Sequence, residues 1–296
     1  MSLANPPVAF KQQFHDSYRD ALAQRDCRFA KASVDRGMIE GSSFTINSLG
    51  TTEMKAVTGR YQDKTPQSLD HNTRVVYMAD YDATIVVDGF DVPKLSADPS
   101  FKYPGLLADA SNRLKDKVIY RALLDAVVTK SGENSFSTTT LPAGQIVLAG
   151  GTAFTKAKAI FARSLFRKNE CDEQNGEQLY ISYNDEMVRQ ILADTTLTSS
   201  DFMAVQMLQS GKVAENWMGF TWVPYQALDN GAGGSSEART VAWAKSGVEI
   251  GMGINFKTDV SENKQKRGHP TEAYGWLSLG AGRQDEKKVV AIDFLR

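Results

Sequence analysis

The chain has 296 residues, of which 42% are hydrophobic, and its 34 basic and 35 acidic residues nearly cancel. The apolar content argues against a disordered chain, and the near-neutral charge argues against a protein that coats nucleic acid with its whole surface. Two cysteines, Cys27 and Cys171, lie too far apart to suggest a disulfide framework.

The first residues show neither the basic start nor the apolar run of a signal peptide. No stretch approaches the roughly 20 apolar residues that cross a bilayer. We therefore expect no membrane contact, and a protein kept in the cytoplasm or in a particle assembled there. The length allows one large domain or two modest ones, each with a hydrophobic core.

The first 75 residues predict an arm followed by a long hairpin. Within residues 1–36, apolar side chains recur every four positions, as on one face of a helix. These are Phe10, Phe14, Tyr18 and Leu22. Residues 37–75 are polar and glycine-rich, and only Phe44 and Ile46 alternate with polar residues as in a strand. Two arms of about 19 residues would each reach about 60 Å. Such a ribbon is marginal alone, so it needs a neighbour to lie against.

Two strands and a long helix follow. Residues 74–79 and 83–87 are dense in β-branched and aromatic residues, which predicts strands. Pro104 suits the first position of a helix, and Gly132 lies just beyond a basic last turn, so we predict a helix over 104–130. Its roughly 26 residues would span about 39 Å, which is long for a globular protein.

The remaining sequence mixes helices and strands and ends in strands. We predict helices over 152–168, from Asn184 onward and over 201–211, strands over 179–182 and 221–225, a flexible loop over 230–236, and four strands between 240 and 294. These elements predict an α+β fold.

No residue pattern predicts a catalytic, cofactor-binding or metal site. None of the histidines has the spacing of a zinc site. They are His15, His71 and His269. Residues 251–253 begin like a dinucleotide fingerprint but lack its third glycine and its helix, and no phosphate loop or nucleophile elbow is present. Cys27 has no histidine near it in sequence and is interpreted as an ordinary, partly buried thiol. We therefore predict a protein that is not an enzyme and uses no cofactor.

Other clusters have simple structural interpretations. The acidic residues between positions 80 and 98 fit solvated strand edges and turns. The basic run 264–269 fits a solvated loop, with phosphate contact as the alternative. The four tryptophans lie in apolar runs, which favours core packing or subunit contact over a base-stacking platform.

The order of elements and three stretches of sequence carry a family resemblance over nearly the whole chain. The stretches are Asp80-Tyr81-Asp82-Ala83-Thr84-Ile85-Val86-Val87-Asp88 leading to Asp98-Pro99, then Ser199-Ser200-Asp201-Phe202 before Gly211-Lys212-Val213 and Gly219-Phe220-Thr221-Trp222-Val223, and last Glu272-Ala273-Tyr274-Gly275-Trp276 before Leu279-Gly280-Ala281-Gly282-Arg283. In combination they resemble the major capsid proteins of tailed double-stranded DNA bacteriophages, which have the Hong Kong 97-type fold.

The resemblance implies a division of the chain. It implies an N-terminal arm at 1–36, an extended β-hairpin loop at 37–75, a peripheral domain at 76–175 with a spine helix at 104–130, an axial domain at 176–240, and return strands of the peripheral domain at 241–296. In such a protein the extended loop would lie over a neighbouring subunit.

The resemblance also implies a function and partners. The protein would be a structural protein of the virion that self-assembles as pentamers and hexamers into an icosahedral capsid around double-stranded DNA. It would be found in the host cytoplasm during assembly. Contact with the DNA would be weak and non-specific, and the portal and a separate scaffolding protein would be further partners. Some relatives cross-link a loop lysine to a neighbour, but we interpret Lys55 and Lys64 as ordinary lysines of an exposed ribbon.

Two other functions stay open at this point. A tail-tube protein or another non-shell phage protein would also assemble, although the long predicted helix argues against it. An α/β enzyme would need a site built from distant residues such as His71, Asp80 and Glu186. The missing motifs weigh against that alternative.

Overall fold

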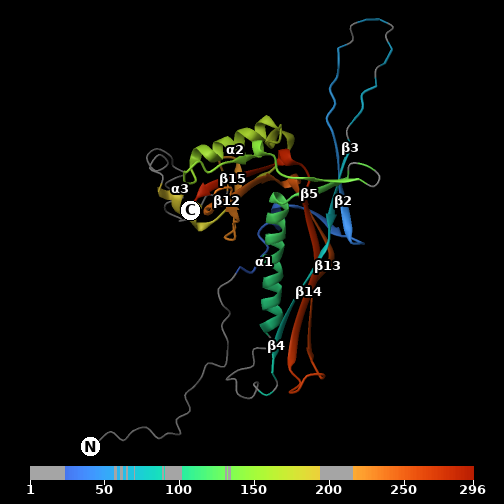
Figure 1. Cartoon of the computed structure of the whole chain (residues 1–296), viewed down its shortest axis with the longest axis vertical. Coiled ribbons are helices and arrows are strands. Elements are labelled where there is room, and N and C mark those ends of the chain that lie inside the picture. The colour runs from blue at the N-terminus through green and yellow to red at the C-terminus, as the bar shows by residue number, and fades with distance from the viewer. Residues whose placement is uncertain are drawn as a thin grey trace, which may run out of the picture.

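The structure is a computed structural model. It describes residues 24–56, 59–60, 63–64, 66–69, 71–88, 90, 102–130, 132, 135–193 and 216–296. Figure 1 shows an elongated molecule in which helix α1 (Tyr103–Leu124) runs beside a long sheet. Helices α2 (Lys156–Lys168) and α3 (Asp185–Ala193) lie to one side, and a thin loop projects from the other. This mixture is the α+β fold that the sequence predicted.

A four-stranded sheet lies against α1. Its order is β1-β13-β14-β4, with β1 at Val34–Met38, β13 at Val248–Glu262, β14 at Thr271–Arg283 and β4 at Ala79–Val87. β1 pairs with β13 in parallel, and the other pairs are antiparallel. α1 buries Leu107, Ile119 and Leu123. Gly275 of β14 leaves room for the ring of Phe256, because a Cβ there would lie 3.1 Å from that ring.

A second four-stranded sheet, the root sheet, carries the projecting loop. Its order is β2-β3-β5-β6, with β2 at Ser43–Leu49, β3 at His71–Tyr77, β5 at Val127–Lys130 and β6 at Phe136–Thr139. β2 and β3 are antiparallel, and Ser43 pairs with Tyr77 at one end and Leu49 with His71 at the other. The hairpin predicted within 37–75 is therefore present.

The helix predicted over 104–130 is wrong at its C-terminal end. α1 ends at Leu124, and Asp125 is extended with φ −67° and ψ 160°. Residues 127–130 form β5, which pairs with β3 and β6. The β-branched residues of this stretch favour a strand. Their partner in β3 lies far away in the sequence, so a local pattern could not reveal it.

The largest sheet holds the main core. Its order is β7-β15-β12-β8-β10-β9, and β11 pairs with β12. The strands are β7 (Ile146–Val147), β15 (Val289–Leu295), β12 (Gly234–Ala244), β8 (Leu179–Tyr183), β10 (Phe220–Pro224), β9 (Asn216–Trp217) and β11 (Asn230–Gly231). Trp243 is fully buried at its centre, edge-on to Phe29 and stacked with Tyr180. We call this sheet, the sheet beside α1 and the helices α1, α2 and α3 together the body.

The last strand of the chain lies in the largest sheet. β15 pairs with β12 over seven residues and with the short strand β7. The largest sheet therefore combines strands from the range 176–240 with one from 241–296 and one from 76–175. The domain boundaries inferred from the resemblance stay a prediction.

Several local predictions are confirmed. β8 covers the predicted strand 179–182, and Asn184 caps α3 by accepting a 3.0 Å hydrogen bond from the Met187 backbone. α2 ends at Lys168 as expected but begins at Lys156, later than the predicted start at 152. The stripe in residues 10–22 and the helix predicted over 201–211 lie outside the described residues.

The predicted flexible loop over 230–236 is instead a hairpin of β11 and β12. Two carboxylates hold its turn. Asp293 accepts a 3.1 Å hydrogen bond from the backbone of Ala232, and Glu237 accepts one of 2.7 Å from the backbone of Gly233. Glycine-rich composition signalled a turn. Of the two carboxylates that order it, Asp293 comes from β15, which is distant in sequence, and Glu237 lies in β12 itself.

Candidate assembly surfaces

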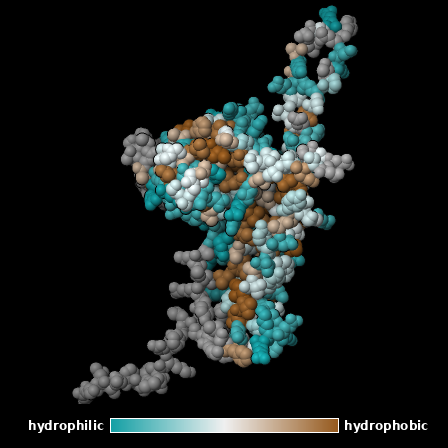
Figure 2. Space-filling view, in the orientation of Figure 1, coloured by the Kyte–Doolittle hydropathy of each residue, from teal (hydrophilic) through white to brown (hydrophobic). Residues whose placement is uncertain are grey.

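The projecting loop between β2 and β3 buries little of itself. Residues 51–56 are all exposed, and Leu49 and Met54 are exposed although they are apolar. The two arms are tied together by side chains, because Thr52 donates a 2.6 Å hydrogen bond to Gln67 and Gln67 donates one of 3.1 Å to the Glu53 carbonyl. Figure 2 shows that this loop is mainly hydrophilic, whereas apolar surface gathers over α2.

The root sheet has a small apolar cluster of its own. Phe44, Ile46 and Val76 are buried together, and Ile39 and Met78 pack against them. This cluster is separate from the main core, which surrounds Trp243. Fully burying such a side chain contributes about 1.5–3 kcal/mol. The root sheet therefore holds to the body with far less apolar contact than the body has within itself.

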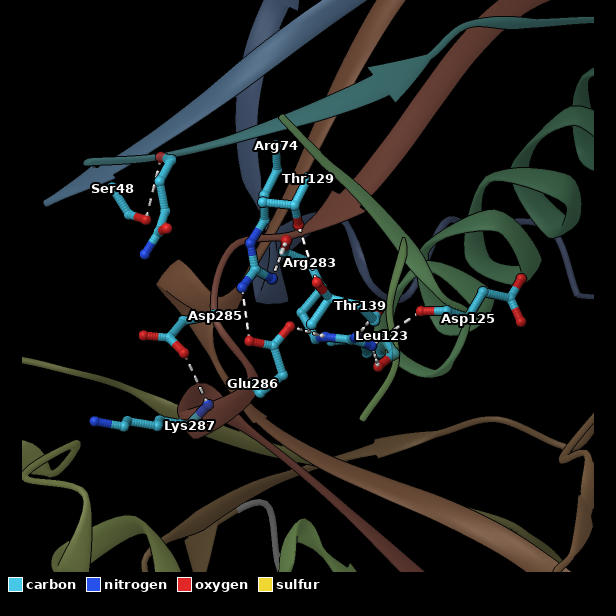
Figure 3. A network of polar contacts seen from close by, with 11 residues as sticks. Ser48, Arg74, Leu123, Asp125, Thr129, Thr139, Arg283, Asp285, Glu286 and Lys287 are labelled. Atoms are coloured by element: carbon cyan, nitrogen blue, oxygen red, sulfur yellow. Dashed lines mark hydrogen bonds and ion pairs between the residues drawn. The ribbon is translucent and has the colours of Figure 1, made fainter. Parts of the chain in front are cut away.

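A cluster of charged side chains, the elbow cluster, lies beside this apolar cluster. Figure 3 shows Arg74, Arg283 and Glu286 converging from three elements. Arg74 of β3 donates a 2.6 Å hydrogen bond to Glu286 and one of 3.1 Å to the Arg283 carbonyl. Arg283, at the end of β14, donates 2.7 and 3.1 Å hydrogen bonds to the carbonyls of Leu123 and Asp125. The elbow cluster thus joins the loop root, β14 and the C-terminal end of α1.

The elbow cluster is nearly dry. Arg283 is 0% exposed and Arg74 is 7% exposed. Burial lowers the pKa of Arg283. Burial also opposes ionisation of Glu286, but the hydrogen bond and charge of Arg74 outweigh it and hold the pKa of Glu286 below its ordinary value. The α1 carbonyls add partial negative charge, because the C-terminal end of a helix dipole is negative. Two guanidiniums therefore share one carboxylate and the end of a helix.

A second buried carboxylate fixes the chain that leads into β1. Asp116 of α1 is fully buried and accepts hydrogen bonds of 3.0 and 2.9 Å from the backbones of Arg28 and Phe29. It also accepts from the Gln24 side chain and, at 3.1 Å, from the Cys27 thiol. Burial, then Asp116, raises the pKa of Cys27 to about 12. Cys27 is partly buried, as the sequence suggested, and its hydrogen bond to Asp116 was not predicted.

A groove runs between α1 and the root sheet. Its volume is about 480 Å³. One wall comes from Val75, Tyr77 and Val128, and the other from Leu114 and Val118 of α1 with charged neighbours at its rim. Phe136 and Tyr77 on the root sheet are exposed, so apolar surface continues beyond the groove.

The residues considered for an enzyme site are not brought together. His71 begins β3 opposite Leu49, Asp80 lies in β4 opposite Ser278, and Glu186 lies in α3. Figure 1 places α3 on the opposite side of the molecule from β3. Among the described residues, no three His, Cys, Asp or Glu side chains form a group that could hold a metal ion.

The tryptophans serve mainly as core. Trp217, Trp222 and Trp243 are buried, and Trp217 and Trp222 lie 5.3 Å apart between ring centroids. Trp276 is partly buried and stacks on Tyr274 at 5.1 Å. The basic run 264–269 lies at the turn between β13 and β14, where Lys266 pairs with Glu272 at 3.3 Å.

Comparison with known proteins identifies the class. The model of a family described as phage capsid protein matches residues 7–296 of the chain. The chain therefore belongs to the phage capsid protein family. No curated protein sequence matches it. Family membership confirms the expected structural, non-enzymatic role and the place of the protein in the virion capsid.

Solved structures confirm the fold. A chain of Mycobacterium phage Che8 matches with a TM-score of 0.71 and 13% identity, over 97% of this chain and 98% of its own. A chain of the cyanophage Pam1 capsid asymmetric unit matches with a TM-score of 0.73 and 13% identity, over 99% and 98%. A chain of the head of Helicobacter pylori bacteriophage KHP40 matches with a TM-score of 0.69 and 10% identity, over 99% of this chain and 98% of its own. The chain thus has the Hong Kong 97-type fold over nearly its full length.

One further property concerns membranes. In the described part of the chain, no helix combines the length and the apolar character that spanning a membrane requires.

The sequence reasoning missed both charged clusters. Asp116 could have been found, because its spacing from the apolar residues Ile119 and Tyr120 places it on the inner face of α1, where a carboxylate needs partners. Arg74 and Arg283 each border an apolar run, which is a weaker signal. Glu286 lies in an ordinary polar turn (Glu286–Lys288), and nothing local marks it.

Proposed function

We propose that this capsid protein assembles as pentamers and hexamers into an icosahedral shell around double-stranded DNA, and that its extended loop lies over a neighbouring copy. The observation that carries the proposal is the projecting loop. Its described residues 51–56 are exposed, and it includes fully exposed Met54. Ordering a segment costs conformational entropy, which a loop without its own core can recover only from contact with another chain.

Exposed apolar surface on the root sheet also supports contact with a neighbouring copy. Exposed Tyr77 and Phe136 and the groove beside α1 offer apolar surface within reach of other copies. Shells are held by many such contacts, so each can be modest when all are made together. Exposed apolar patches on soluble proteins commonly mark interaction sites.

The other partners rest on composition and on the family. A net charge of −1 allows a shell to face DNA without gripping it, so contact would be weak and local. The basic turn 264–269 and the slightly basic arm are the segments best suited to such contact. A portal and a separate scaffolding protein complete the proposed set. The arm at 1–36, the loop at 37–75, the peripheral domain at 76–175 and 241–296, and the axial domain at 176–240 are the proposed parts.

Removing the loop while keeping its root tests the proposal. Leu49 and His71 are paired in antiparallel strands, so a two-residue Asn-Gly turn can replace residues 50–70 without disturbing β2 or β3. We expect a folded, soluble protein that forms no closed shells in negative-stain microscopy. The control is Lys55→Ala with Lys64→Ala, which should leave shells intact. Normal shells from the loop deletion would contradict the proposal.

A further inference from the structure

We propose that Glu286 is a positioning residue that fixes the direction in which the extended loop leaves the body. It does so by fixing the position of Arg74 of the root sheet relative to Arg283 and the end of α1. The inference rests on the proposed function of the loop, because a direction matters only for a loop that must meet a neighbour.

The root sheet needs such a device because its apolar contacts with the body are few. Phe44, Ile46 and Val76 form a small cluster, and Val76 lies close above Gly282 of β14. Apolar contact is non-directional, so a cluster of this size permits the sheet to rock on the body. A directional interaction must therefore set the angle.

The elbow cluster supplies that direction. The guanidinium of Arg74 is a planar fork, and its two terminal nitrogens bind different elements. One binds Glu286 at 2.6 Å and the other binds the Arg283 carbonyl at 3.1 Å. Arg283 in turn binds the carbonyl of Leu123 in the last turn of α1. The loop root is thus aligned with β14 and α1 at the same time.

Leverage makes this alignment important. Each arm from β2 or β3 to the tip has roughly 11 residues and would reach about 35 Å when extended. A rotation of about 10° at the root would then move the tip by about 6 Å, which is more than the width of a strand spacing. A neighbouring copy would be met in the wrong place.

Among the described residues, Glu286 is the carboxylate that forms an ion pair with both arginines. Its side chain lies 2.6 Å from Arg74 and 3.5 Å from Arg283. Within the described residues, Nε of Arg283 faces Oε1 of Glu286 at 3.5 Å as an ion pair, and Nε of Arg74 has no hydrogen-bond partner. Without the carboxylate, two buried guanidiniums would repel each other across the joint between loop and body.

The test uses the full-length chain with Glu286→Gln, which keeps the side-chain shape and removes the charge. Arg74→Lys is the second variant, because it keeps the charge and loses the fork. The matched control is Glu173→Gln, which breaks the pair of Glu173 with Arg163 away from the loop. Each variant is examined as free subunit by hydrogen–deuterium exchange and as assembled product by negative-stain microscopy.

We expect the exchange of amides in β2 and β3 to accelerate at least tenfold in both elbow variants, while β12 and β15 keep wild-type protection. The yield of closed shells should fall at least tenfold, and the control should match the wild type. If Glu286→Gln does not fold, Arg74→Lys decides by the same readouts.

Two results would overturn the inference. One is closed shells at wild-type yield from the elbow variants, and the other is loss of protection in all strands together. The exchange comparison is made on subunits, so it tests the elbow even if wild-type protein forms no shells. Failure of the wild-type protein to form shells would count against the proposed function alone.

Discussion

The body and the root sheet are each stabilised in a different way. The body surrounds a large apolar core, with Trp243, Phe154 and Phe294 fully or almost fully buried. The root sheet has four buried apolar residues, Phe44, Ile46, Val76 and Val127, and depends on Arg74 and its partners. A core of many contacts tolerates the loss of one polar bond, whereas a joint with few contacts depends on each. The difference teaches that rigidity of the loop and stability of the protein are set by separate groups of residues.

The largest expected effect lies in the body. Trp243→Ala removes a fully buried ring that packs on Phe29 and Tyr180 and donates a 2.7 Å hydrogen bond to the Ala32 carbonyl. We expect the free energy of unfolding to fall by about 4 kcal/mol, because of the cavity and the lost burial. Chemical denaturation measures it. Trp276→Ala, at a partly buried position, is the control and should cost clearly less. Equal losses at the two positions would contradict the picture of one dominant core.

The second effect concerns the joint between the entering chain and α1. Asp116→Ala removes the acceptor of the Arg28 and Phe29 backbone hydrogen bonds and leaves those buried N–H groups unpaired. We expect a loss of about 3 kcal/mol. We also expect limited proteolysis to begin near residues 24–29. Asp109→Ala, at a carboxylate 3.9 Å from exposed Arg25, is the control and should change little. Cleavage elsewhere first would show that Asp116 does not anchor this segment.

The sequence revealed most of what local patterns can carry. Alternation and capping residues located β8 and the start of α3, because those signals lie within a few residues of each other. The end of α1 was wrong because β5 is made by pairing with β3, and the α1 carbonyl at Leu123 is taken by Arg283, 160 residues later. The elbow cluster was invisible for the same reason, since Arg74 and Glu286 are separated by 212 residues. Long-range partners decide both, and a single sequence does not display them.

The third prediction is a pH dependence of the root sheet. The pKa of Glu286 lies below the ordinary value of 4.5 because Arg74 stabilises its charged form. A depressed pKa contributes stability above the ordinary value, and that stability is lost as the pH falls below 4.5 through the folded-state pKa. Glu286→Gln should therefore be less stable than the wild type by about 2 kcal/mol at pH 7, as expected for a hydrogen bond to a charged group, and the difference should shrink below pH 4.5.

Denaturation of the wild type and of Glu286→Gln at pH 7, 5 and 4 measures this difference. Asp125, whose pKa burial raises, is present in both proteins and so largely cancels in the comparison. A difference that stays constant down to pH 4 would show that the charge of Glu286 does not stabilise the joint.

The smallest effect compares the thiol of Cys171 in the body with the thiol of Cys27 in the entering segment that Asp116 holds against α1. Burial raises the pKa of Cys171 to about 11, and burial with Asp116 raises that of Cys27 to about 12. At pH 8 the thiolate fractions would then be about 10⁻³ and 10⁻⁴, so both cysteines should react slowly with a maleimide.

Asp116→Asn separates the two thiols. It removes the negative charge beside Cys27 and loosens the segment that covers it, so labelling of Cys27 should accelerate. Cys171 lies among Glu177, Lys288 and Asp172 and should not respond. Mass spectrometry of the labelled peptides gives both rates from one sample. Faster labelling of both cysteines would mean that the body and the entering segment open as a single unit. Faster labelling of Cys27 alone requires the entering segment to open while the body stays closed.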